Sequence, residues 1–126
     1  MKLLLDTHLL LWWLGGSRSL PKSARAVIAD PATTVFVSAV SLWEIWLKQS
    51  LGKLRLPADF KERLAEEPFE SLPLTAAHAR EVARLPWHHR DPFDRMLIAQ
   101  ATVAGLRLAT ADGEIQRYGD VVLLMN

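Results

Sequence analysis

The chain has 126 residues, a formal net charge of +1 at pH 7 and no cysteine. Half of its residues are hydrophobic and 23% are charged, which is typical of one globular domain spanning residues 1–126 and excludes a disordered chain. The lack of cysteine excludes disulfides, thiol catalysis and Cys-ligated zinc. The near-zero net charge argues against a protein that binds polyanions by bulk electrostatics alone.

The chain begins with a predicted strand and helix. A short apolar run at 2–5 ends at an acid, as a buried parallel strand does, and a helix follows at 7–14 until a Gly-Gly pair. Asp6 and His8 interrupt this apolar stretch, no cleavage site follows, and its length falls short of the roughly 20 residues of a membrane span. We therefore expect a soluble, cytoplasmic protein that does not contact membranes.

The rest of the chain continues this alternation. A second helix is expected at 19–30, between two prolines, and the β-branched run TTVFV predicts a strand at 33–37. A serine then caps a helix at 38–52. Further helices are predicted at 57–67, 75–85, 91–105 and 112–118, and further strands at 69–74, 106–110 and 121–125. Strands that alternate with helices predict a parallel α/β sandwich.

Two acids directly follow predicted strands. Asp6 comes after the first strand and begins a helix, and Asp112 comes after the strand at 106–110. Each has a purely structural interpretation, Asp6 as a helix N-cap and Asp112 as a turn or cap residue. Thr110, two residues before Asp112, can orient a carboxylate or act as a cap.

Two further acids lie in apolar helices. Glu44 is the only charged residue in AVSLWEIWL, a helix that is apolar around most of its circumference and is therefore expected to be buried. The alternative to a functional role is an i,i+4 ion pair with Lys48. Asp94 lies in the first turn of a helix that Asp91 is expected to cap, where an acid suits the helix dipole. It shares a face with apolar residues, so it points inward or along the rim of a cleft.

These four acids are more informative together than singly. Asp6 and Asp112 lie at the carboxyl ends of predicted strands, and Glu44 and Asp94 lie near the starts of helices that follow such ends. Open α/β sheets bind ligands at that edge. Four carboxylates gathered there repel one another unless a cation compensates, and oxygen ligands favour Mg²⁺ or Mn²⁺ over zinc.

Four segments in this order, LLLDTHLLLWWL, SAVSLWEIWLKQSLGKL, HHRDPFDRMLIAQA and LATAD, resemble the PIN-domain nucleases. Within these, the chain is most similar to the VapC-like toxins of bacterial type II toxin–antitoxin pairs, over nearly its whole length. The resemblance implies a PIN-like three-layer α/β sandwich with a central, mostly parallel sheet of about four to five short strands flanked by helices. It also implies an endoribonuclease that is a homodimer and is inhibited by a small cognate antitoxin.

The resemblance also assigns the site. The acidic positions of the family fall on four residues of this chain, none of them substituted: Asp6, Glu44, Asp94 and Asp112. The three aspartates would bind Mg²⁺ or Mn²⁺ directly or through water, and Glu44 would position the ion or its waters. The metal would activate water to hydrolyse an RNA phosphodiester bond, with one or two ions taking part.

Other residues are candidates for supporting roles. Residues expected to support the metal-binding acids are Thr7, Thr110 and Glu114. Residues expected to contact RNA are Lys48, Arg90, Arg95 and Arg18, with Lys53 and Arg55 extending the same track. Each of these cations can instead be solvated or ion-paired.

The histidines and tryptophans are harder to assign. The histidine spacing fits no standard pair of metal ligands, so structural or rim positions are expected for His8, His78, His88 and His89. Five tryptophans are many for this length, and most are expected in the core. Trp12 or Trp13 is expected to help form a groove for the antitoxin or a second subunit.

Two other classes of function remain open at this point. One is a different metal-dependent nuclease or a phosphatase on the same acidic site, because nothing in the sequence separates RNA from DNA. The other is a non-catalytic interaction module, in which the acids only cap helices and pair with bases.

Overall fold

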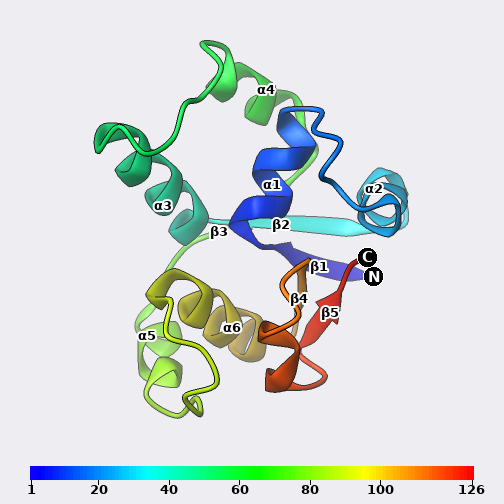
Figure 1. Cartoon of the computed structure of the whole chain (residues 1–126). Helices are drawn as coiled ribbons and strands as arrows, with labels where there is room; N and C mark the ends of the chain where they lie inside the picture. Colours follow the sequence, from blue (N-terminus) through cyan, green and yellow to red (C-terminus); the bar gives the residue numbers. More distant parts are fainter.

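The computed structural model describes residues 1–126 as a single five-stranded sheet with helices on both faces (Figure 1). The strands are β1 (Lys2–Leu5), β2 (Thr34–Ser38), β3 (Glu70–Leu72), β4 (Arg107–Thr110) and β5 (Val122–Leu124). They lie in the order β3-β2-β1-β4-β5, and every neighbouring pair is parallel. The predicted sandwich with a central parallel sheet is therefore confirmed.

All the predicted helices are present, with shifted ends. They are α1 (Thr7–Leu14), α2 (Lys22–Ala29), α3 (Ala39–Ser50), α4 (Phe60–Glu66), α5 (Ala76–Val82), α6 (Pro92–Ala104) and a 3₁₀ helix, η1 (Ile115–Tyr118). Five of them, α2, α3, α4, α5 and η1, are shorter than predicted by three or more residues, because the first and last turns of helices are where turn geometry competes with helix formation. None of the helices combines the length and apolar character needed to cross a bilayer.

The strand β1 lies at the centre of the core. Leu3 and Leu5 pack into a cluster with α1, α2 and α4, whereas Leu4 packs into a second cluster with α6 and η1. Because successive side chains of a strand point to opposite faces, a strand covered by helices on both sides is apolar at every position. This is why KLLL reads as a continuous apolar run.

The same strand is where the order of the sheet reverses. β1 pairs with β2 on one side and with β4 on the other. The Asp6 N–H donates to the Ala109 carbonyl at 3.0 Å, so the pairing of β1 with β4 continues to the start of α1. The carboxyl ends of β1 and β4 therefore lie side by side, in the position where open α/β sheets bind ligands.

The prediction that most tryptophans lie in the core is wrong. The exposed fractions of Trp43, Trp46 and Trp87 are 59%, 37% and 76%, and Trp12 and Trp13 are half-buried. α3 is covered along one stripe only, because it lies at the margin of the sandwich, and its outer apolar side chains remain open to solvent.

Candidate active site at the carboxyl ends of β1 and β4

Asp6 both caps α1 and faces the edge of the sheet. Its Oδ1 accepts the Leu9 N–H at 2.8 Å, which is the helix-capping bond predicted for it. Its Oδ2 accepts the Thr110 hydroxyl at 2.6 Å. Burial raises the pKa of the Asp6 carboxyl above 3.8 in spite of these two hydrogen bonds, and the nearby charge of Asp112 adds to the rise. The site therefore holds a carboxylate that is costly to ionise.

Thr110 links the ends of the two strands. Its hydroxyl donates to Asp6, and its oxygen accepts the Asp112 N–H at 3.0 Å. Asp112 lies on an exposed turn after β4, where its Oδ1 accepts the Glu114 N–H at 2.9 Å. Thr110 therefore has both of the roles considered for it. Its hydroxyl orients the Asp6 carboxylate and also caps the turn by accepting the Asp112 N–H.

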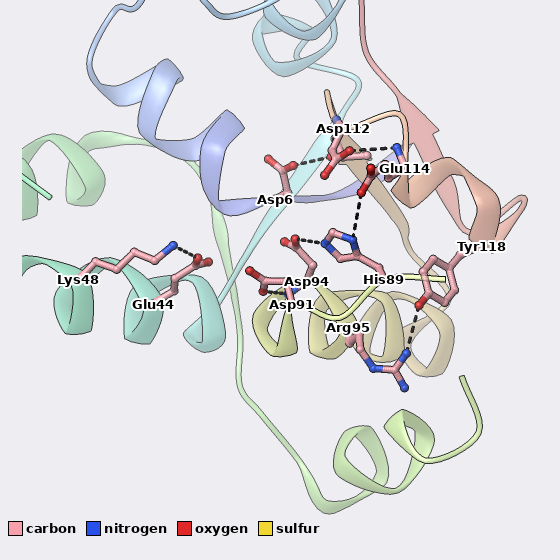
Figure 2. A network of polar contacts seen from close by, with 11 residues as sticks. Asp6, Glu44, Lys48, His89, Asp91, Asp94, Arg95, Asp112, Glu114 and Tyr118 are labelled. Carbon is pink, nitrogen blue, oxygen red and sulfur yellow. Dashed lines mark hydrogen bonds and ion pairs between the residues drawn. The ribbon is translucent and has the colours of Figure 1, made fainter. Parts of the chain in front are cut away.

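Asp94 enters the same space from the first turn of α6. Asp91 caps this helix, since its Oδ1 accepts the Asp94 N–H at 3.0 Å. The pKa of the Asp94 carboxyl is raised to about 6, chiefly by burial and further by the charges of Asp91 and Asp6. A contact with His89 opposes this rise. Figure 2 shows the Asp94 side chain near that of Asp6, whose charge adds to the rise.

His89 lies beside these acids, a position that its spacing in the sequence did not reveal. Its Nε2 lies 2.9 Å from Asp94 Oδ2, and its Nδ1 lies 3.7 Å from Glu114 Oε2. His89, Asp112 and Glu114 each present one possible ligand atom, and these atoms lie within 4.8 Å of one another. His89 is on the loop before α6, so no helical or strand periodicity could have indicated its orientation.

Glu44 lies on α3 with only 3% of its surface exposed. Its Oε2 contacts Lys48 Nζ at 2.6 Å, which is the ion pair considered from the sequence. Its Oε1 is buried and has no hydrogen-bond partner. Glu44 is the largest cause of the raised pKa of the Lys48 ammonium group, and Asp91 and Asp94 add to the rise. Figure 2 shows Glu44 beside the site, on the side of Asp91, and one of its oxygens is uncommitted.

A groove opens beside the acids, between α1, α3 and the segment that leads into α4. Its volume is about 440 Å³. Its lining includes apolar residues (Leu11, Trp12, Ile45, Leu54, Leu56 and Phe60), cations (Lys48, Lys53 and Arg55), and Thr7, His8 and Glu44. Thr7 also donates its hydroxyl to Ser41 on α3 at 3.1 Å, which joins the two helices at the end of the groove nearest Asp6.

The structure contradicts an RNA-contacting role for Arg95. This residue is only 3% exposed, because it points away from the acids toward α5 (Figure 2). Its guanidinium donates to the carbonyls of Val82 and Pro86 and to the Tyr118 hydroxyl, and it lies 3.7 Å from the centre of the Trp87 ring. Arg95 thus anchors the loop before α6 with both of its terminal amino groups.

The other proposed RNA contacts are on the surface. Arg90 is exposed and directly precedes the acid that caps α6. Arg18 is also exposed, but it follows the end of α1 opposite to Asp6, about 12 Å away along the helix axis. Lys48 pairs with Glu44 and lines the groove together with Lys53 and Arg55, whereas Arg90 lines a separate hollow with Arg95.

The chemistry of the donors suits a hard divalent cation. The pKa values of Asp6 and Asp94 are raised, chiefly by burial and further by neighbouring carboxylates, so a bound cation would favour their ionised forms. A buried oxygen of Glu44 has no partner. Carboxylate oxygens that are buried, mutually repelling and partly unsatisfied are the ligands that Mg²⁺ and Mn²⁺ take in proteins.

The fold and the site define a class of protein: an α/β protein whose acids gather at the point where its parallel sheet reverses order. The sequence model of the PIN domain matches residues 3–121, so the chain belongs to the PIN domain family. It is 31% identical over 119 residues to Ribonuclease VapC22 of Mycobacterium tuberculosis (strain ATCC 25618 / H37Rv), which covers 91% of this chain and 90% of that protein. The resemblance read from the sequence is thereby confirmed.

Solved structures share the fold. VapBC2 from Rickettsia felis, bound to a DNA fragment from its promoter, matches with a TM-score of 0.74 and 15% identity over 100% of this chain and 98% of that chain. FitAcB from Neisseria gonorrhoeae matches with a TM-score of 0.65 and 22% identity over 98% and 96%. VapBC-5, a toxin–antitoxin system of Mycobacterium tuberculosis, matches with a TM-score of 0.63 and 22% identity over 99% and 98%.

Proposed function

We propose that this protein is a divalent-metal-dependent endoribonuclease and the toxin of a toxin–antitoxin pair. The observation that carries the proposal is the convergence of Asp6, Asp94 and Asp112 from β1, α6 and the turn after β4 (Figure 2). The relative named a ribonuclease supports the choice of RNA as substrate.

The three aspartates and Glu44 are the residues that would hold the metal. Asp6 accepts one protein hydrogen bond on each oxygen and Asp94 accepts one on Oδ2, so both retain lone pairs for a ligand. The uncommitted Glu44 Oε1 is suited to an ordered water. When bound, Mg²⁺ or Mn²⁺ supplies a Lewis acid for the attack of water on the phosphodiester.

The remaining groups of the site orient the acids and attract the substrate. The Thr110 hydroxyl and the helix-capping N–H of Leu9 hold both oxygens of Asp6, so this carboxylate cannot rotate freely. Lys48, with Lys53 and Arg55 along the same groove, provides positive charge beside an acidic pocket that would otherwise repel a phosphate backbone. In this proposal, cationic side chains at the rim attract the RNA phosphates, and the carboxylates at the centre bind the metal ion.

Cleavage of RNA by the purified protein tests this proposal. RNA and DNA of matched sequence are incubated with Mg²⁺, Mn²⁺ or EDTA, with wild type, Asp94→Asn and the control Asp120→Asn, an exposed acid outside the site. Cleavage of RNA that needs metal, is lost in Asp94→Asn and persists in the control is the expected result. Cleavage unaffected by Asp94→Asn, or confined to DNA, contradicts the proposal.

The groove between α1, α3 and α4 is proposed to bind the antitoxin. Its apolar floor and its cations suit an amphipathic segment that carries acidic residues. The solved toxin–antitoxin structures with this fold support a protein partner. Trp12→Ala should weaken binding of the cognate antitoxin, whereas Trp13→Ala, at a neighbouring residue that does not line the groove, should not. Equal binding by both variants, measured by calorimetry, counts against this groove.

A homodimer is the third part of the proposal. Trp43, Leu74 and Trp87 are exposed around an apolar hollow of about 310 Å³ that lies between α3, α5 and α6. Large apolar side chains gathered on a surface favour association. Light scattering of the purified protein should give twice the chain mass, and a monomer mass at micromolar concentration contradicts it.

A further inference from the structure

His89 lies between two parts of the acidic site that come from distant segments of the chain. Asp94 belongs to the first turn of α6, and Glu114 to the turn that leads into η1. The imidazole faces both, with Nε2 at 2.9 Å from Asp94 Oδ2 and Nδ1 at 3.7 Å from Glu114 Oε2 (Figure 2). The side chain of His89 is only 15% exposed, so it is held in this gap and does not extend into solvent.

The loop that carries His89 is held by hydrogen bonds from Arg95 and Tyr118. Arg95 donates to the carbonyls of Val82, Leu85 and Pro86, and the Tyr118 hydroxyl also donates to Pro86 at 2.8 Å. Tyr118 belongs to η1, and Arg95 directly follows Asp94 on α6. The two elements that present the acids therefore also hold the start of this loop at Pro86, three residues before His89.

The position of His89 matters because repulsion from neighbouring acids favours rotation of the Asp94 carboxylate away from them. Asp94 is a half-buried carboxylate near Asp91 and Asp6, whose charges oppose its own. A single N–H donor on Oδ2 holds its plane and leaves Oδ1 free to bind a cation. A metal-binding carboxylate often accepts a hydrogen bond on the oxygen that does not contact the metal, and removal of that donor commonly lowers metal affinity by 10- to 100-fold.

We propose that His89 is a positioning residue for the cation site. It holds Asp94 through Nε2–H and keeps the turn bearing Asp112 and Glu114 at a set distance from α6. It acts through these acids and is not itself a ligand. This inference rests on the proposed metal site and adds a residue to it that the acidic pattern does not contain.

Metal binding by His89 variants tests the proposal without any assay of cleavage. The affinity for Mg²⁺ and for Mn²⁺ is measured by calorimetry on full-length wild type, His89→Ala, His89→Gln and His89→Asn. The Gln amide can donate from near the position of Nε2, whereas the shorter Asn amide cannot reach it. We expect about a 10- to 100-fold loss for Ala, a similar loss for Asn and retention within a few-fold for Gln. His88→Ala is the matched control, since His88 packs against the Tyr118 ring and makes no contact with an acid of the site.

The outcomes separate this inference from the proposed function. Absence of divalent cation binding by wild type overturns both, whereas equal affinities of wild type and His89→Ala overturn the positioning role alone. Should His89→Ala fail to fold, equal affinities of the Gln and Asn variants overturn it instead. Pulsed EPR of bound Mn²⁺ checks the remaining alternative: a directly coordinated nitrogen that disappears in His89→Gln makes His89 a ligand and refutes positioning.

Discussion

Replacement of Asp94 by asparagine should stabilise the metal-free protein. The pKa of Asp94 is raised from 3.8 to about 6 by burial and by the charges of Asp91 and Asp6. A difference of this size corresponds to about 3 kcal/mol, at about 1.4 kcal/mol per pKa unit. Because the folded protein binds this proton more tightly than the unfolded chain, the stabilising effect is present below pH 3.8 and is lost as the pH rises to about 6 and above.

Asparagine keeps the size of the side chain and an oxygen that can accept from His89, and it removes the charge. At pH 7.5 in EDTA, Asp94→Asn should therefore unfold at a higher urea concentration, with a gain of up to about 3 kcal/mol. At pH 4 the wild-type carboxyl is already protonated in the folded state, so the gain should vanish. The difference in unfolding free energy between the two proteins, followed from pH 4 to 7.5, isolates this residue from the other titrating groups.

Added Mg²⁺ should narrow this difference in stability. Wild type gains about 2.7 kcal/mol when the free ion is at 100 times its Kd, whereas a variant that lacks one ligand gains less at the same concentration. A difference between the two proteins that does not change with pH would refute the electrostatic reasoning. A gain with Mg²⁺ that is equal in both would refute the assignment of Asp94 as a ligand.

Three further substitutions test other parts of the site. Thr110→Val leaves a buried oxygen of Asp6 without its donor, so we expect a loss of about 1–3 kcal/mol in urea unfolding and a higher Asp6 pKa by NMR, with Thr110→Ser close to wild type. Arg95→Met should cost about 3 kcal/mol and speed amide hydrogen exchange in the loop before α6, because buried carbonyls lose a charged donor; unchanged exchange would contradict the anchoring role. Glu44→Gln should lower the pKa of Lys48 toward 10.5, since Glu44 is the largest cause of its rise, and an unchanged Lys48 titration by NMR would show that this pair does not persist in solution.

The fold could be predicted because its signals are local. A strand covered on both faces must be apolar at each position, as in KLLL, and a helix must begin with a residue that accepts free N–H groups, as Asp6 and Asp91 do. The order of these signals along the chain is enough to predict a parallel α/β sandwich. The ends of the shorter helices were predicted less well, because turn geometry and packing decide them.

The acids could be predicted for a related reason. Asp6 and Asp112 follow strands of one parallel sheet, and such strands end at the same edge. The capping role and the site role of Asp6 are both present, since one oxygen serves the helix and the other accepts from Thr110. The choice between these two interpretations could not be made from the sequence, because they use different atoms of the same side chain.

The directions of side chains outside the regular pattern were decided by the tertiary structure alone. Arg95 is adjacent to Asp94 in the chain, yet one helical step of about 100° directs its side chain away from the acids. Its guanidinium instead donates to backbone carbonyls of the preceding helix and loop. His89 meets Glu114 across 25 residues of sequence because two loops are brought together by α6 and η1. The exposed face of α3 is apolar like its buried face, and only the positions of its neighbours decide which tryptophans are covered. Local periodicity therefore determines the elements and the acids they present, whereas contacts between distant segments determine which neighbours complete the site.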